Sequence, residues 1–178
     1  MLSLIITQIV ALKHPSRVLS ISLIMTSNFD SSLPKKDMKV TEALGELKIK
    51  NWRNKDEVIK CFIKKSKLLI GPKHKFDEEK IRRLNEEEFD RASNLQSREN
   101  HGLIRGWESY LSRTNEINVP TLIIHGTKDP IIPYEHGVHL SKIIPDAVLV
   151  TLEETGHEIH YNDWDEIIDA ISKHAANL

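Results

Sequence analysis

The sequence has little of what defines several classes of protein. Its 178 residues include a single cysteine, Cys61, which excludes an internal disulfide framework and a cysteine-rich zinc module. It has no internal repeat and no tract rich in glycine, serine or proline, so low-complexity architectures are excluded too. The remaining composition, 39% apolar and 29% charged residues, is typical of a soluble globular protein. The near-absence of cysteine favours a reducing compartment, and we expect a cytoplasmic location.

The apolar run at the amino terminus is too short to cross a membrane. Leu2–Leu12 contains only three polar residues, but a spanning helix needs about 20 apolar residues. No basic residue precedes the run and no small-x-small cleavage site follows it, as a signal peptide would require. We predict a buried helix that ends near His14, because Pro15 disfavours helical geometry in the residue before it. We expect no targeting segment and no membrane partner.

The net charge is close to zero but unevenly distributed. The formal value is −1, which argues against a protein that coats nucleic acid. Residues 1–89 carry 18 Lys and Arg against 12 Asp and Glu, and residues 90–178 carry 7 against 14. The excess between Lys35 and Lys75 is most simply interpreted as solvated helix faces, with an anion-attracting surface as the alternative. Because no aromatic-rich RNA-binding motif, zinc-finger spacing or zipper heptad accompanies these lysines, we predict no nucleic-acid partner.

Short apolar segments at both ends of the chain predict a parallel sheet. The β-branched segment 18–25 and the apolar run 119–124 are typical of buried strands, and a third strand is expected at 147–152. Helices are expected at 135–143 and 161–176. This alternation of strand and helix is characteristic of α/β proteins with a parallel sheet.

The middle of the chain, from about residue 37 to residue 113, is helical in character. Apolar residues recur at helical spacing over 56–63, and Gly71 with the following proline ends that helix. Acidic residues from Asp77 onward open the next helix, where the helix dipole favours them. A further helix is expected from Arg98 to Leu111.

These expectations divide one α/β fold into three parts. Residues 1–28 form a helix and a strand of the core. Residues 29–116 form an inserted helical domain. Residues 117–178 supply the rest of the core, with two strands and two helices. The insertion interrupts one sheet and does not separate two sheets.

Two predicted loops at the carboxyl edge of the sheet carry groups capable of acid–base chemistry. Asp129 follows strand 119–124, and His157 follows strand 147–152. Because reactive groups gather where parallel strands end, we expect the two side chains to lie close together. A carboxylate that accepts a hydrogen bond from one imidazole nitrogen fixes the tautomer and stabilises the imidazolium that forms later. The alternatives are an Asx turn for Asp129, which precedes a proline, and an ordinary hydrogen-bonded loop histidine for His157.

Several segments resemble the α/β-hydrolase superfamily. The segment 119–133, with its His-Gly-Thr-Lys-Asp-Pro core, looks like the acid-bearing segment of that family. Ile-Pro-Asp-Ala at 144–147, followed by Gly-His at 156–157, is similar to its last strand and histidine loop. The segment 8–18 is similar to the helix that follows the family's nucleophile, and the helical insertion resembles the lid or cap of the esterase-like branch. Together these similarities cover most of the chain.

The resemblance implies a hydrolase of carboxylic esters or similar acyl substrates that uses no cofactor. It implies Asp129 as the acid of a catalytic triad and His157 as the general base. The cap, residues 29–116, would then shape a pocket for a small-molecule substrate.

The sequence departs from the family pattern at the nucleophile. The family's nucleophile lies in a Gly-x-Ser-x-Gly turn between a strand and a helix, and no such motif occurs in these 178 residues. Counting back along the similar helix places the nucleophile at about Met1. Ser3, the nearest hydroxyl, lacks both glycines and lies in a run that is predicted to pack as a helix.

We therefore expect a hydrolase that is truncated before its nucleophile and inactive alone. One alternative is a non-catalytic scaffold or partner subunit that keeps the fold, and another is a gene model that starts inside a longer reading frame. Without half of the sheet, the strand near 18–26 or its neighbour would have an unpaired apolar edge, which predicts possible self-association.

The other histidines do not predict a metal site. His157 and His160 are three residues apart, whereas His-Glu-x-x-His places its histidines four apart on one helix face. His125, His136 and His139 have no carboxylate at a suitable ligand spacing, and we interpret them as surface or packed histidines. No glycine-rich phosphate loop is present, so the sequence predicts neither a metal nor a cofactor.

Overall fold

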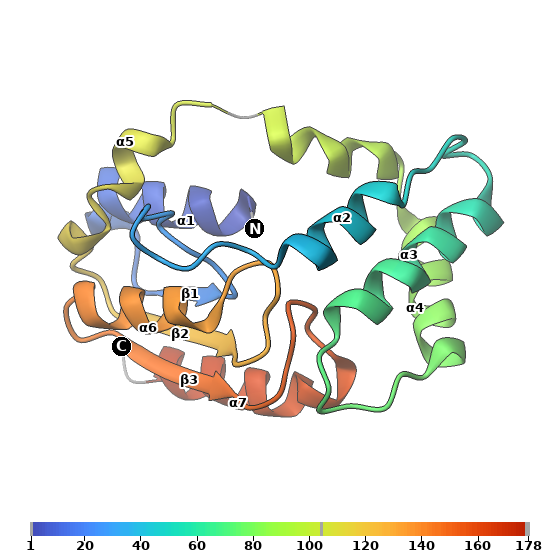
Figure 1. Ribbon diagram of the computed structural model, residues 1–178. Helices are drawn as coiled ribbons and strands as arrows, with labels where there is room; N and C mark the ends of the chain where they lie inside the picture. The colour runs from blue at the N-terminus through green and yellow to red at the C-terminus, as the bar shows by residue number, and fades with distance from the viewer. Residues whose placement is uncertain (1, 104, 177–178) are drawn as a thin grey trace.

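The structure is a computed structural model that describes residues 2–103 and 105–176 (Figure 1). Its strands are β1 (Ile21–Ile24), β2 (Thr121–Gly126) and β3 (Val148–Leu152). They form a parallel sheet in the order β1-β2-β3. Each strand overlaps a predicted one, so the predicted α/β class with a parallel sheet is confirmed.

Helices cover both faces of this sheet (Figure 1). Side chains alternate along the strands, so Leu23 and Ile123 pack toward one face while Leu122 and Ile124 pack toward the other. The first face is covered by α1 and α6, and the second by α7. The bounds of these elements, with the short 3₁₀ turns next to them, are α1 (Leu2–Lys13), η1 (Pro15–Arg17), α6 (Tyr134–Ile143), η4 (Tyr161–Asp163) and α7 (Trp164–Ala176).

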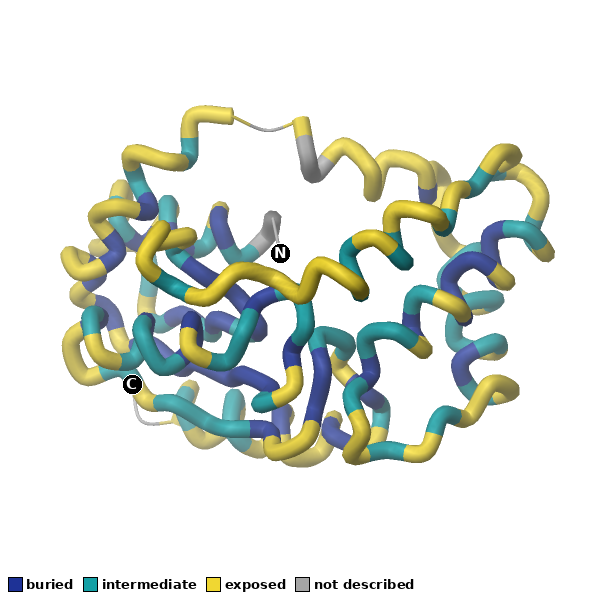
Figure 2. Tube along the Cα trace, in the orientation of Figure 1, coloured by how far each residue is buried: buried dark blue, intermediate teal, exposed yellow. Residues whose placement is uncertain are grey.

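The central strand β2 explains why its sequence reads as a continuous apolar run. All six of its residues are buried, because β1 and β3 flank it and helices cover both of its faces. Figure 2 shows the buried stretches concentrated in the sheet and in α3, whereas α2 is largely exposed.

Of the helices between β1 and β2, α2, α3 and α4 lie to one side of the sheet, whereas α5 lies beside α1 (Figure 1). The longer helices each begin at a residue whose side chain accepts a hydrogen bond from the first turn, and these N-caps are Asp37, Asn54 and Asp77. The helices α3 and α4 pack through isoleucines of their facing sides in a cluster of their own. The bounds here are α2 (Met38–Glu46), α3 (Lys55–Leu69), α4 (Glu78–Arg91), η2 (Leu95–Leu103), α5 (Glu108–Leu111) and η3 (Thr114–Glu116).

The prediction of a helix from Arg98 to Leu111 is wrong. The chain instead forms the 3₁₀ segment η2 and then the single turn α5. Between them Gly106 has a φ of +85°, a left-handed conformation that a continuing right-handed helix cannot contain. The other helices overlap their predicted positions, and α1 ends at Lys13, one residue before the predicted end.

None of the helices in residues 2–103 and 105–176 combines the length and the apolar character that a membrane crossing requires. The division at residues 28 and 116 stays a prediction.

Candidate active site

The loops that follow β2 and β3 lie against each other at the carboxyl edge of the sheet. The register pairs Gly126 with Leu152 as the last residues of the two strands. Beyond this pair, Lys128 N–H donates to the carbonyl of Thr155 at 3.0 Å, which keeps the two loops in contact. This backbone contact brings the two loops that carry the reactive side chains together at the carboxyl edge of the sheet.

Asp129 and His157 form a direct hydrogen bond between these loops. Nδ1 of His157 lies 2.7 Å from Oδ2 of Asp129. The Asp129 side chain is 0% exposed and the His157 side chain is 21% exposed. Because an ionised carboxylate only accepts, Nδ1 carries the proton and Nε2 keeps its lone pair. This is the tautomer that a general base needs.

The Asx-turn alternative for Asp129 is also present, on the other carboxylate oxygen. Oδ1 accepts hydrogen bonds from the backbone N–H groups of Ile131 and Ile132, each at 2.8 Å. The turn and the histidine contact are therefore compatible, since each uses a different oxygen. The turn holds the carboxylate so that Oδ2 is presented to His157.

A second histidine, His125 at the end of β2, supports the same carboxylate. Its Nε2 donates to the carbonyl of Ile132 at 2.8 Å and lies 3.6 Å from Oδ2 of Asp129. Burial alone raises the pKa of Asp129, but the nearby ring of His125, the hydrogen bond from His157 and the backbone N–H of Ile132 together outweigh burial and lower the pKa to about 2. Asp129 is therefore a carboxylate at neutral pH.

His157 lines a cavity of about 620 Å³ between its loop and the helices α3 and α4 with η2. Glu158 also lines this cavity, and burial raises the pKa of its carboxyl group, although a hydrogen bond from Ser66 opposes the shift. The sequence analysis missed Glu158, and its position next to His157 was the available signal. The cavity residues contributed by α3, α4, η2 and the turn before α3 include Trp52, Phe62, Lys65, Ser66, Asn85, Glu88 and Arg98.

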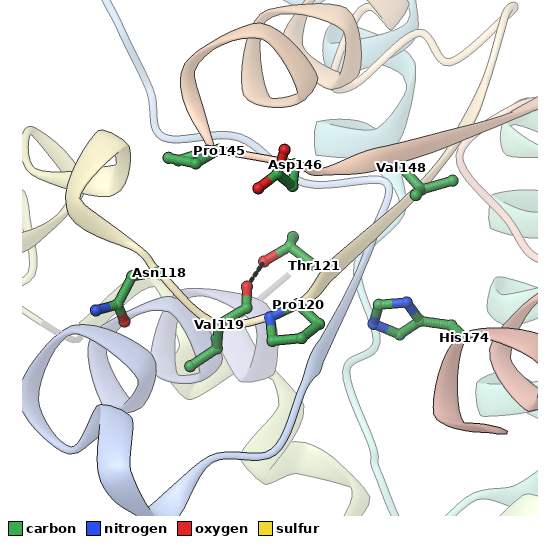
Figure 3. A pocket seen from close by; sticks show the side chains of 8 residues that line it. All are labelled: Asn118, Val119, Pro120, Thr121, Pro145, Asp146, Val148 and His174. Carbon is green, nitrogen blue, oxygen red and sulfur yellow. Dashed lines mark hydrogen bonds between the residues drawn. The ribbon is translucent and has the colours of Figure 1, made fainter. Parts of the chain in front are cut away.

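Two other cavities differ in their relation to this pair. A mainly apolar one of about 500 Å³ lies between the loop 27–38 and the residues Ile131 and Ile132, directly beside the turn of Asp129. The one shown in Figure 3, about 440 Å³, is lined by Thr121 and Val148, the first residues of β2 and β3. It therefore lies at the amino ends of these strands, away from the pair.

A Ser–His contact, which the sequence analysis did not foresee, has a structural role. Oγ of Ser27 lies 2.6 Å from Nδ1 of His136, and Nε2 of His136 bonds the carbonyl of Pro34 at 2.8 Å. Oγ also accepts from the N–H of Phe29, and Ser27 is fully buried. Nε2 of this imidazole hydrogen bonds a backbone carbonyl and not the carboxylate that the histidine of a triad would bond. The pair therefore anchors the loop that follows β1. In the part of the chain that the structure describes, no three His, Cys, Asp or Glu residues are grouped so as to hold a metal ion.

The comparisons with known proteins agree with the fold. A model of the alpha/beta hydrolase fold matches residues 5–163, which is most of the chain. The chain belongs to the alpha/beta hydrolase fold family. Among solved structures, the chain is similar to a meta-cleavage product hydrolase, CumD, from Pseudomonas fluorescens IP01, with a TM-score of 0.69 and 15% identity. An esterase from Exiguobacterium antarcticum gives a TM-score of 0.59 at 18% identity. At these identities the structures show the shared fold alone.

The chain covers less than half the length of the curated relatives that it matches. It is 30% identical over 136 residues to the uncharacterized hydrolase YugF of Bacillus subtilis, covering 74% of this chain and 45% of YugF. The structural alignment with CumD covers 98% of this chain and 61% of CumD. The alignment with the Exiguobacterium esterase covers 95% of this chain and 62% of the esterase. The position assigned to the nucleophile, Met1, lies outside the described residues, as does the side chain of Ser3.

Proposed function

We propose that Asp129 and His157 are the acid and the general base of a hydrolase that acts on carboxylic esters or similar acyl compounds. The observation that carries this proposal is the 2.7 Å contact between a buried carboxylate and Nδ1 of a partly exposed imidazole. His157 would take the proton of the nucleophile through Nε2 and return it to the leaving group. Asp129 would orient the ring and stabilise the imidazolium between these steps.

The helical residues 29–116 act in this proposal as a cap that shapes the substrate pocket. The cavity at His157 combines aromatic side chains, Trp52 and Phe62, with polar and charged ones such as Asn85 and Arg98. Such a mixture suits a small organic substrate with an apolar part and a polar acyl group. Arg98 itself is held by Glu88 at 2.9 Å and lies over the ring of Phe62, which fixes this wall of the cavity.

The chain by itself is proposed to be inactive. Its sequence has no Gly-x-Ser-x-Gly motif, and loss of the nucleophile from such a triad costs about 10⁶-fold in turnover. Loss of oxyanion donors removes on the order of a further 10²- to 10³-fold. The same missing motif supports the second candidate, a non-catalytic scaffold or partner subunit that keeps the hydrolase fold.

We expect no enzymatic turnover of p-nitrophenyl acetate by the purified chain. Its rate should equal that of His157→Ala, and of a control, His14→Ala, whose imidazole is exposed at the end of α1. Release of p-nitrophenol, followed by absorbance, measures this rate. Turnover in the enzyme range that is lost in His157→Ala but kept in His14→Ala would overturn the proposed inactivity.

A chimera separates the hydrolase proposal from the scaffold alternative. The residues of YugF that precede its matching segment are joined to Leu2, so that a relative supplies the first half of the fold. Ester hydrolysis that falls at least about 10³-fold in His157→Ala supports the acid–base assignment. A folded chimera without turnover, or with turnover that does not depend on His157, favours the scaffold.

The free edge of the sheet supports a further part of the proposal, self-association. In the sheet order β1 is an edge strand, and an unpaired strand edge invites pairing with another chain. Apolar side chains flank it: Leu19, just before β1, is 80% exposed, and Ile6 and Val10 on the adjacent helix α1 are also exposed.

We expect the chain to sediment as a dimer or larger species that Leu19→Lys shifts toward monomer. A charge next to the edge disfavours strand pairing. Leu103→Lys is the matched control, because Leu103 is 71% exposed but lies in η2, outside the sheet. Analytical ultracentrifugation measures the change. A wild-type chain that is a monomer throughout contradicts this expectation.

A further inference from the structure

The loop that carries His157 is held by the end of α3 through backbone contacts. The N–H of Gly156 donates to the carbonyl of Ile70 at 3.0 Å, and the N–H of Glu158 donates to the carbonyl of Leu69 at 3.2 Å. These donors are the two residues on either side of His157. The catalytic loop therefore takes its anchorage from a helix that lies about ninety residues earlier in the chain.

The contact is close because two glycines meet in it. A Cβ atom at Gly156 would overlap the carbonyl oxygen of Leu69, and one at Gly71 would overlap the backbone nitrogen of Gly156. Gly71 also has a φ of +80°, a left-handed conformation that a side chain disfavours. The two backbones can therefore touch only without side chains between them.

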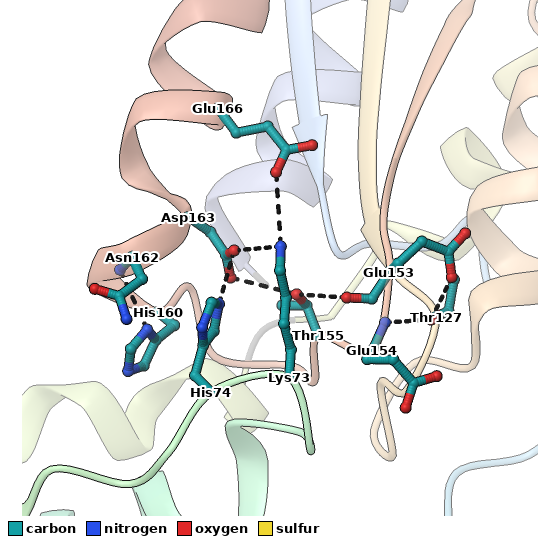
Figure 4. A network of polar contacts seen from close by, with 10 residues as sticks. All are labelled: Lys73, His74, Thr127, Glu153, Glu154, Thr155, His160, Asn162, Asp163 and Glu166. Carbon is teal, nitrogen blue, oxygen red and sulfur yellow. Dashed lines mark hydrogen bonds and ion pairs between the residues drawn. The ribbon is translucent and has the colours of Figure 1, made fainter.

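A buried carboxylate, Asp163, joins the same two segments through side chains (Figure 4). Its side chain is 1% exposed, and Oδ1 accepts from Nζ of Lys73 at 2.7 Å and from Nε2 of His74 at 2.8 Å. Its other oxygen, Oδ2, accepts from the hydroxyl of Thr155 at 3.3 Å. Lys73 and His74 follow α3, Thr155 precedes the catalytic histidine, and Asp163 ends η4 just before α7, so one carboxylate connects three segments.

Asp163 and Lys73 form the ion pair of this cluster. Burial raises the pKa of Asp163, but the hydrogen bonds from Lys73 and His74 outweigh burial and lower it. The hydrogen bond to Asp163 in turn raises the pKa of Lys73. Removal of one partner of such a pair is strongly destabilising, because it leaves the buried charge of the other partner uncompensated. Glu166 adds a second, longer contact to Lys73 at 3.7 Å.

Ring stacking extends the connection toward the histidine loop. The rings of His74 and His160 stack with centroids 4.3 Å apart and planes inclined by 15°. His160 is almost fully buried and lies three residues after His157. The segment 73–74 thus contacts the loop on both sides of the catalytic histidine, at Thr155 through Asp163 and at His160 through stacking.

We infer that Lys73, His74 and Asp163 are positioning residues that hold the loop of His157 against α3, so that the orientation of the catalytic imidazole depends on docking of the α3–α4 helices. The inference rests on the proposed function for the role of His157. Their interactions reach Thr155 and His160, on either side of His157, so they act on His157 through its loop. A displacement of α3 would move the base, which couples the cap to the acid–base pair.

The first test is amide hydrogen exchange at Gly156 and Glu158 in the full chain. In Asp163→Asn we expect exchange at both amides to rise at least about tenfold, because the loop loses a hydrogen bond to a charged group. Exchange of Ile123 should stay within about twofold, because Ile123 is fully buried in the core of the sheet between β1 and β3. Asp90→Asn is the matched control, since it breaks an exposed ion pair with Lys55 elsewhere on the same helices.

The second test follows the Nδ1–H proton of His157 by NMR. We expect this signal to be sharp in the wild-type chain, broadened in Asp163→Asn and Lys73→Met, and restored in Lys73→Arg, which keeps a charged donor. Unchanged exchange and an unchanged ring signal in Asp163→Asn would overturn the inference. So would equal effects in Asp90→Asn, or a rise in exchange that includes β2, because either would indicate general destabilisation. Neither readout requires turnover, so an inactive chimera with these shifts present would refute the proposed function and leave the positioning role standing.

Discussion

Gly156→Ala is expected to destabilise the chain by about 3 kcal/mol, a large effect for the addition of one methyl group. The new Cβ would meet the carbonyl oxygen of Leu69 and backbone atoms of Ile70 and Gly71. A long side chain could rotate away, but these are backbone atoms at the end of a helix. They can move only if the hydrogen bond from Gly156 to Ile70 breaks. Urea unfolding followed by circular dichroism measures the loss as a lower midpoint at a similar slope.

Gly45→Ala provides the matched control for this prediction. Gly45 lies within α2, and a Cβ there would have no atom within 4 Å. Alanine is the better helix former, so this variant should gain roughly 0.5–1 kcal/mol. If both variants had the same small effect, the close approach of the histidine loop to α3 would not exist in solution.

The features that could be predicted from the sequence depend on short local segments of the chain. The apolar run 119–124 indicated a buried parallel strand because a strand covered on both faces needs no polar alternation, and β2 is buried along its whole length. The contact of Asp129 with His157 was predictable because both follow neighbouring parallel strands, whose carboxyl ends meet at one edge.

The features that the sequence did not reveal depend on partners far apart in the chain. Lys73 and Asp163 are separated by 90 residues, and Lys73 is one of many lysines in its region, so nothing local distinguishes it. The contact of Ser27 with His136 was not predictable for the same reason, because 109 residues separate the two. The error at 98–111 has a different cause, because a local signal was present. Gly106 lies within the predicted helix and indicated a break there.

Asp129→Asn is expected to destabilise the folded chain at neutral pH by removing the contribution of the ionised Asp129. The wild type loses the same contribution when acid protonates this carboxylate. The folded-state pKa of Asp129 is about 2, against an ordinary value of 3.8. A carboxyl group whose pKa is lowered by folding contributes stability above its unfolded pKa and loses that contribution as the pH falls toward the folded pKa. The window is therefore about pH 4 to pH 2, and the contribution is on the order of 2 kcal/mol.

The comparison of variant and wild type isolates this contribution from other acidic groups. Asp163 also has a lowered pKa and titrates in both proteins, so its effect cancels in the difference. Asparagine keeps a carbonyl oxygen for the amides of Ile131 and Ile132, but its amide group cannot accept from Nδ1 of His157. We expect the wild type to be more stable than the variant at pH 7 and the difference to shrink by about 2 kcal/mol by pH 2. Urea midpoints measured at intervals between these pH values test it. A constant difference would mean that folding does not lower the pKa of Asp129, and the buried carboxylate–imidazole contact would then not hold in solution.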